Sequence, residues 1–209
     1  MVEENLKQNL SSVEYAIKYP FTNKKSKYGS FSQGIIAILL FPLIIPLFVF
    51  MGYTNNMLEN SISDNKESPK FNEYHKLLHI GIEKMISYSP LIVLSLFIFS
   101  ASLIFGPFFF GFIPAVFLFA PAITILYSEK RDYQEVYTSD LIDIVFTEKY
   151  VRLLLYYITF NTLFAATIIW LISISLGFGA VIFAPLFFYS RMAFLGYLYS
   201  TKYDELKIE

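Results

Sequence analysis

Three long stretches of the chain carry no charged side chain. Residues 28–58, 85–128 and 153–190 contain no Asp, Glu, Lys or Arg. A helix needs roughly 20 apolar residues to cross the hydrocarbon core of a bilayer. The second and third stretches are therefore each long enough for two crossings. The first is long enough for one crossing or for a shallow excursion into the membrane.

The composition agrees with a membrane protein. Of the 209 residues, 56% are hydrophobic and only 16% are charged, whereas about a quarter of the residues of a typical soluble domain are charged. The apolar runs are continuous and lack the alternation of a β-barrel strand. We therefore predict an all-α, polytopic helical membrane protein that forms one domain over residues 1–209.

The first hydrophobic segment, residues 31–53, follows a polar N-terminal segment, residues 1–30. It contains Pro42 and Pro46, and each proline removes a backbone donor and disturbs the preceding helical turn. The pattern predicts a segment that is kinked or broken near its middle, and that is either a fifth span or re-entrant. Residues 54–70 are polar and predict a loop.

Residues 71–87 have apolar side chains on one helical face and polar side chains on the other, which is typical of a helix in the membrane interface. The polar face consists of Glu73, His75, Lys76, His79, Glu83 and Lys84. Residues 88–127 follow as a predicted transmembrane hairpin, because Gly106-Pro107 and Gly111 interrupt an apolar stretch that is long enough for two crossings.

Residues 137–150 form a second predicted interfacial helix, and residues 151–199 a second transmembrane hairpin that turns near Gly177. The pattern thus predicts four crossings besides the first segment. Shifting the chain by 64 positions aligns Phe119-Ala120-Pro121 with Phe183-Ala184-Pro185. The two halves are either a parallel repeat or two apolar stretches that resemble each other by chance.

The distribution of basic residues predicts an orientation. Lys and Arg lie in the termini, in the long loops or near the span ends, and cytoplasmic loops are enriched in both. We predict a multi-pass protein of the cell membrane with its basic loops and C-terminus in the cytoplasm. A re-entrant first segment places all basic residues on one side, whereas a crossing places the N-terminal lysines opposite the others.

Metal-binding chemistry has little support in the sequence. His75 and His79 are four residues apart, a spacing that allows two histidines to share a metal. The residues between them include Lys76, whose charge disfavours a cation, and lack the glutamate of a zinc-protease helix. We interpret the histidines as a polar interfacial pair and predict no metal and no other cofactor.

Two polar residues lie within the predicted spans. Arg191 is the only charge of the last span, and Asn161 lies near the middle of the preceding span, beside Thr162. An intramembrane arginine marks a functional site in some proteins and reaches back to the headgroups in others. An asparagine lines a substrate path or, more often, bonds a neighbouring helix. We favour headgroup contact for the arginine and helix bonding for the asparagine.

Several short motifs follow one another along the chain. They are Tyr19-Pro20-Phe21, Gly34, Gly52-Tyr53, Pro69-Lys70-Phe71 before a helix that contains Gly81, and a closing segment around Pro185, Phe187 and Gly196. Together they resemble the uncharacterised membrane family called domain of unknown function 4013, which is found largely in archaea. Ile80 stands where that family often has an acidic residue. The resemblance implies a membrane architecture and no activity.

The sequence favours a non-enzymatic function, because the predicted spans contain no Asp or Glu and no nucleophile–histidine–carboxylate set is indicated. Our first hypothesis is a membrane scaffold or accessory subunit, with membrane lipids and a protein partner or a second copy as its contacts. The net charge of −1 argues against nucleic acid. The alternative is a small transporter, channel or lipid-handling protein. A cavity lined by Asn161, Thr162 and Arg191 would favour the alternative, and a sealed bundle packed by Phe would favour the scaffold.

Overall fold

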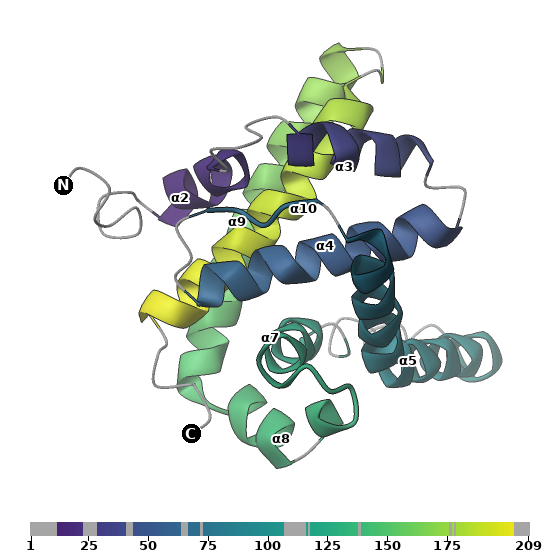
Figure 1. Cartoon of the computed structure of the whole chain (residues 1–209). Helices are drawn as coiled ribbons and strands as arrows, with labels where there is room; N and C mark the ends of the chain where they lie inside the picture. The colour runs from purple at the N-terminus through teal and green to yellow at the C-terminus, as the bar shows by residue number, and fades with distance from the viewer. Residues whose placement is uncertain are drawn as a thin grey trace.

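The computed structural model describes residues 12–22, 29–40, 44–63, 67–71, 73–106, 116, 118–137, 139–175, 177 and 179–202. Every regular element in these ranges is helical (Figure 1). The all-α prediction is therefore confirmed. The first described elements are α2 (Ser12–Lys18) and the short 3-10 turn η1 (Tyr19–Phe21), and both pack against the last long helix.

The first hydrophobic segment is broken, as its prolines predict. It forms α3 (Gly29–Leu39) and α4 (Ile44–Ile62), and Figure 1 shows that the two helices run in opposite directions. Pro46 lies in the first turn of α4, where a missing N–H leaves no helical bond unmade. Pro42 lies outside the described residues.

The predicted loop at residues 54–70 is wrong over its first part, because α4 continues to Ile62. Three of its polar side chains, Thr54, Asn55 and Ser61, are buried within the helix packing. Ser61 donates a hydrogen bond to the Ala193 carbonyl at 3.1 Å, and Asn55 accepts one from Ser128 at 3.1 Å. These bonds satisfy the side-chain oxygens that would otherwise be left unpaired in the core, so polarity here marks helix contacts and no loop.

Residues 71–87 do not form a separate helix. They lead into a single helix of 32 residues, α5 (Tyr74–Phe105), which has Pro90 inside it. Figure 1 shows α5 changing direction part-way along its length, as expected where a proline removes a bond of the helical ladder. The helix ends at Gly106, which has a φ of 109°. Residues 107–115 lie outside the described residues.

Helices α4 and α5 cross at backbone contact through two reciprocal glycines. A Cβ atom added to Gly52 would lie 1.9 Å from the Leu77 carbonyl oxygen, and one added to Gly81 would lie 1.8 Å from the Phe48 carbonyl oxygen. Small residues permit such close approach of helices in membrane proteins. The crossing fixes the first half of α5 against the broken first segment.

The predicted second crossing of the 88–127 hairpin is not found among the described residues. This part of the chain forms α7 (Ala120–Lys130), a helix of 11 residues that is almost wholly buried by the rest of the protein. At 1.5 Å per residue it spans roughly 16 Å, about half the thickness of a hydrocarbon core. Its end is marked by Arg131 in the left-handed conformation.

The predicted helix 137–150 is divided by a helix cap. A 3-10 turn, η3 (Glu135–Tyr137), and α8 (Ser139–Val145) precede Thr147, whose hydroxyl accepts a hydrogen bond from the Tyr150 amide at 3.1 Å. A threonine in this position satisfies one of the free amides at a helix start, so α9 (Glu148–Ile174) begins there.

The last hairpin agrees with the prediction. It consists of α9 and α10 (Ala180–Tyr197), with Gly177 at a φ of 88° in the turn between them. The chain continues into the π-helical turn η4 (Leu198–Lys202). The aligned repeat motifs occupy different places here, since Pro121 lies at the start of α7 and Pro185 inside α10.

Three helices in the described part of the chain are long and apolar enough to cross a membrane. They are Tyr74–Ile104, Glu148–Ile174 and Ala180–Thr201. This agrees with a multi-pass membrane protein, while the count of four crossings is not confirmed. The spans at residues 74–104 and 148–174 are largely uncovered by the protein itself, with 11% and 17% of their most apolar windows buried.

One ion pair joins distant segments at the surface. Arg131, just after α7, contacts Glu59 of α4, and their side chains are 39% and 28% exposed. Such partly solvated pairs typically contribute about 0–1 kcal/mol. We therefore expect Glu59→Gln to shift the thermal midpoint of the purified protein by less than about 4 °C. A larger decrease of the thermal midpoint would mean that the ion pair positions α7 against α4.

Candidate functional site

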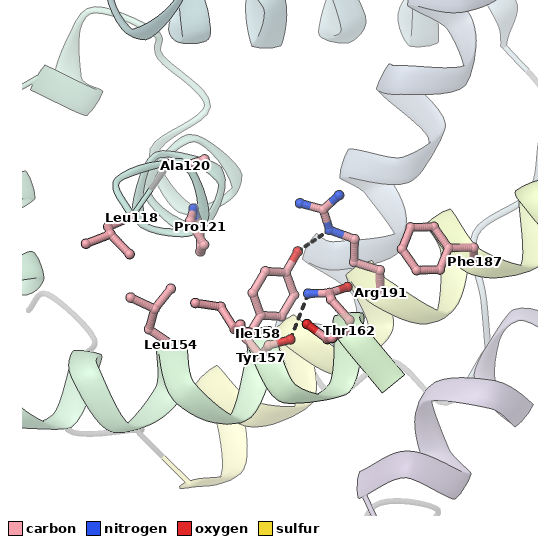
Figure 2. Close-up of a pocket in the computed structure, with 10 residues that line it drawn as sticks. Leu118, Ala120, Pro121, Leu154, Tyr157, Ile158, Thr162, Phe187 and Arg191 are labelled. Atoms are coloured by element: carbon pink, nitrogen blue, oxygen red, sulfur yellow. Dashed lines mark hydrogen bonds between the residues drawn. The ribbon is translucent and has the colours of Figure 1, made fainter. Parts of the chain in front are cut away.

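A pocket of about 550 Å³ lies between the start of α7 and the facing sides of α9 and α10 (Figure 2). Its volume falls within the roughly 300–1,000 Å³ range of small-molecule sites. Most of its wall is apolar. The apolar lining residues are Leu118, Ala120, Pro121, Leu154, Ile158 and Phe187.

The polar part of the wall is centred on Arg191. Its Nε donates a hydrogen bond to the Tyr157 hydroxyl at 2.5 Å, and its guanidinium carbon lies 5.5 Å from the centroid of the Tyr157 ring. Figure 2 shows the two side chains next to each other in the pocket wall, joined by this hydrogen bond. The arginine thus contacts the facing helix, whereas the sequence favoured contact with the headgroups.

No carboxylate pairs with Arg191 among the described residues. A guanidinium offers five N–H donors and is always charged. The bond to Tyr157 uses one of these donors. The terminal nitrogens are left to bind an anionic group, which makes this the strongest candidate site in the described part of the chain.

Asn161 lines the same pocket but does not bond a neighbouring helix. Its side-chain amide donates to the Tyr157 carbonyl of its own helix at 2.8 Å, and its Oδ1 is buried without a hydrogen-bond partner. A buried acceptor without a donor is costly. The pocket therefore presents an acceptor beside the cation of Arg191.

Tyr150 holds the α7 side of the pocket in place. Its hydroxyl donates to the Leu118 carbonyl at 2.5 Å and accepts from the Ala122 amide at 3.2 Å. The side chain is 1% exposed. One phenol thus ties α9 to the segment that supplies Leu118 and Pro121 to the pocket wall.

The pocket opens toward the outer face of α9. Ile158 and Thr162 line it and are themselves exposed. Leu155 lies three residues before Ile158 and is 60% exposed on the same side of the helix. Since α9 is a candidate membrane span, this opening lies on a surface suited to contact with lipid acyl chains.

The histidine pair lies apart from this pocket. His75 and His79 are exposed on the first turns of α5, and His79 Nδ1 lies 3.5 Å from Glu83 Oε2. Glu83 also accepts a hydrogen bond from Tyr127 at 2.9 Å. No group of three metal-ligating side chains occurs among the described residues. The polar-pair interpretation stays a prediction.

Sequence reasoning found Arg191, Asn161 and Thr162, which the structure brings together. It missed Tyr157, because one tyrosine among many in an apolar stretch carries no local signal. It also placed Lys84 on a polar face, whereas this side chain is 3% exposed. Only the packing of α5 against other helices reveals that burial.

No protein-family model, curated protein or solved structure matches the chain. The resemblance to domain of unknown function 4013 therefore stays a prediction.

Proposed function

We propose that this protein is a multi-pass membrane protein that binds an anionic amphiphile from the bilayer in the pocket between α7, α9 and α10. The observation that carries the proposal is the guanidinium of Arg191, which lies in a mostly apolar pocket and has no carboxylate partner among the described residues. The protein acts by binding and moving or presenting a lipid, and not as an enzyme.

The chemistry of the pocket supports this class of ligand. A wholly polar ligand would place polar atoms against the side chains of Leu118, Leu154 and Phe187. A wholly apolar ligand would leave the positive charge of Arg191 without a counter-charge. An amphiphile with a negative headgroup satisfies both parts of the wall. The exposed rim at Ile158 and Thr162 gives such a molecule a lateral path from the bilayer.

We infer that α3 and α4 form a re-entrant hairpin. α3 has 11 residues and spans roughly 16 Å, which is too short to cross a core of about 30 Å. The two helices run in opposite directions (Figure 1). The N-terminal lysines and the basic residues between α4 and α5 then share one side, which we assign to the cytoplasmic side of the cell membrane.

Cysteine labelling tests this topology in a chain that contains no natural cysteine. Lys18 and Ser63 are exposed on either side of the α3–α4 hairpin. We expect Lys18→Cys and Ser63→Cys to react with a membrane-impermeant maleimide in the same condition, either in intact cells or only after permeabilisation. Reaction in opposite conditions would show that the segment crosses.

Photocrosslinking tests the pocket. Vesicles would contain the full chain and a phospholipid with a photoactivatable acyl chain. We expect the double variant Ile158→Trp/Thr162→Trp, which obstructs the rim, to lose most of the labelling of residues 118–121. Leu163→Trp/Ile174→Trp is the matched control, because both residues are exposed on α9 and neither lines the pocket. Equal labelling of both double variants and the wild type would overturn the proposal.

A membrane scaffold or accessory subunit is the second candidate. The observation that favours it is the apolar surface of α5 after Pro90, where Phe97, Leu103 and Ile104 are at least 70% exposed.

One experiment distinguishes the scaffold from the lipid-binding protein. It consists of crosslinking in native membranes, followed by affinity capture of the full chain and mass spectrometry of proteins and lipids. A stoichiometric partner protein supports the scaffold, and a specific co-captured lipid supports the binding proposal.

A further inference from the structure

The pocket has a polar side and an apolar side. Figure 2 shows Leu118 and Leu154 on the side away from Arg191, and the Tyr157 hydroxyl next to the guanidinium. Ile158 lies one helical turn after Leu154 on α9 and continues the apolar wall toward the rim. A ligand whose charged group lies at Arg191 therefore has its apolar part along the start of α7 and along α9.

The charge of the pocket matches a ligand with one negative charge. Arg191 is the only charged side chain among the described residues that line it. Its Nε is used by the bond to Tyr157, and Figure 2 shows the two terminal nitrogens on the side of the guanidinium that faces away from this bond. The terminal nitrogens form a planar fork whose parallel N–H groups fit the two oxygens of a carboxylate. A carboxylate thus matches both the charge and the shape of this cation.

The polar part of the wall can satisfy only a small headgroup. The Tyr157 hydroxyl accepts the bond from Arg191 and has one O–H left to donate. Asn161 Oδ1 is a buried acceptor and offers an anion no hydrogen bond. A phosphodiester headgroup has ester oxygens and further polar groups beyond its charged oxygens, and these would lie unpaired against the apolar wall. The two oxygens of a carboxylate need no donors beyond those of Arg191 and Tyr157.

The volume of the pocket fits one acyl chain. A methylene group is close in size to a water molecule, whose share of liquid volume is about 30 Å³, so a pocket of about 550 Å³ holds roughly 18 non-hydrogen atoms of a ligand. A fatty acid with about 16 carbons has about this number of non-hydrogen atoms. A phospholipid with two such chains has more than twice as many, so at least one of its chains would stay outside.

We propose that the ligand of the pocket is a single-chain carboxylate amphiphile, a long-chain fatty acid taken from the bilayer. This inference rests on the proposed function of the pocket. The carboxylate binds the terminal nitrogens of Arg191 and accepts the O–H of Tyr157, and the acyl chain lies against Leu118 and Leu154. The chain passes the rim at Ile158 when the molecule enters or leaves.

Competition for photocrosslinking tests the inference in the wild-type protein. Phosphatidylcholine vesicles would contain the full chain and a trace of palmitic acid with a photoactivatable group in its chain, and mass spectrometry would measure the labelling of residues 118–121. We expect unlabelled palmitic acid to halve the labelling at a concentration at least about tenfold below that of dioleoyl phosphatidylglycerol, the effect of one charge-assisted hydrogen bond. Methyl palmitate is the matched control, because it has the same chain and no charge, and it should compete poorly.

A pair of variants tests the role of the cation. Arg191→Gln should raise the concentration of palmitic acid that halves the labelling by about tenfold or more. Arg191→Lys keeps the charge without the planar fork, and its value should lie between those of the wild type and Arg191→Gln. The same concentration in all three proteins would overturn the binding of the carboxylate by Arg191. The comparison of competitors in the wild type does not depend on the folding of either variant.

The remaining outcomes separate this inference from the proposed function. Labelling by both the fatty acid and the photoactivatable phospholipid that is insensitive to Ile158→Trp/Thr162→Trp would overturn the pocket as a lipid site, and the inference with it. Labelling that depends on the rim but is competed equally by methyl palmitate would support the pocket and overturn the carboxylate. Labelling that depends on the rim but is competed best by phosphatidylglycerol would support the pocket and overturn the single-chain ligand.

Discussion

We expect Gly81→Ala to destabilise the protein by about 2 kcal/mol or more, the cost of overpacking a close-packed site. The added Cβ would lie 1.8 Å from the Phe48 carbonyl oxygen of α4. A backbone oxygen cannot rotate away as a side chain can, so α4 and α5 must move apart. Alanine is intrinsically the better helix former by roughly 1 kcal/mol, and the expected loss therefore has the opposite sign to helix propensity.

Gly52→Ala tests the same crossing from the other helix, because its Cβ would meet the Leu77 carbonyl oxygen at 1.9 Å. Gly34→Ala is the control. There the nearest atoms all belong to the Tyr189 side chain, so relief requires displacement of one ring and no separation of two helix backbones. Thermal unfolding in detergent should give melting temperatures that are lower by about 4 °C or more for Gly52→Ala and Gly81→Ala. The decrease for Gly34→Ala should be smaller. A gain of stability at Gly81 would contradict the close crossing.

We expect Tyr150→Phe to have the second large effect, because it removes one hydroxyl that serves two backbone groups, of which the Ala122 amide is fully buried. The Leu118 carbonyl loses its donor and the Ala122 amide loses its acceptor. Each buried group left unsatisfied costs about 1–3 kcal/mol. The phenyl ring retains the packing of the side chain, so the loss reports the hydrogen bonds.

The variant also connects stability to the pocket. Since the two bonds hold the segment that contributes Leu118 and Pro121 to the wall, Tyr150→Phe should lower photocrosslinking of lipid at residues 118–121 as well as the melting temperature. Tyr74→Phe is the matched control, because Tyr74 is 54% exposed. Unchanged crosslinking with a lowered melting temperature would limit Tyr150 to a structural role.

The sequence by itself determined the class of protein and several boundaries. Long uncharged stretches indicate a bilayer, because a charged side chain in the hydrocarbon core costs free energy and a crossing helix must therefore be free of charge over its length. Pro42 and Pro46 predicted the break in residues 31–53, and the glycine at 177 predicted the turn of the last hairpin. These features depend on the local backbone, and local chemistry is sufficient to predict them.

The tertiary structure decided what each polar side chain does. Asn55 and Ser61 look like loop residues in the sequence, yet they bond Ser128 and the Ala193 carbonyl inside the bundle. Lys84 looks like part of a solvated face and is enclosed by the fold. Whether a polar group is exposed, paired or left to bind a ligand depends on which other helix faces it, and helix periodicity does not carry that information.

The candidate site shows the same division. The sequence identified Arg191 and Asn161 because polar residues within apolar spans stand out one by one. It did not identify Tyr157 or the segment before α7, since their importance lies in a juxtaposition across 30 or more positions of the chain. A pocket is formed by the packing of α7, α9 and α10. The binding role that we propose for Arg191 depends on the absence of a counter-charge on the described helices that pack around it.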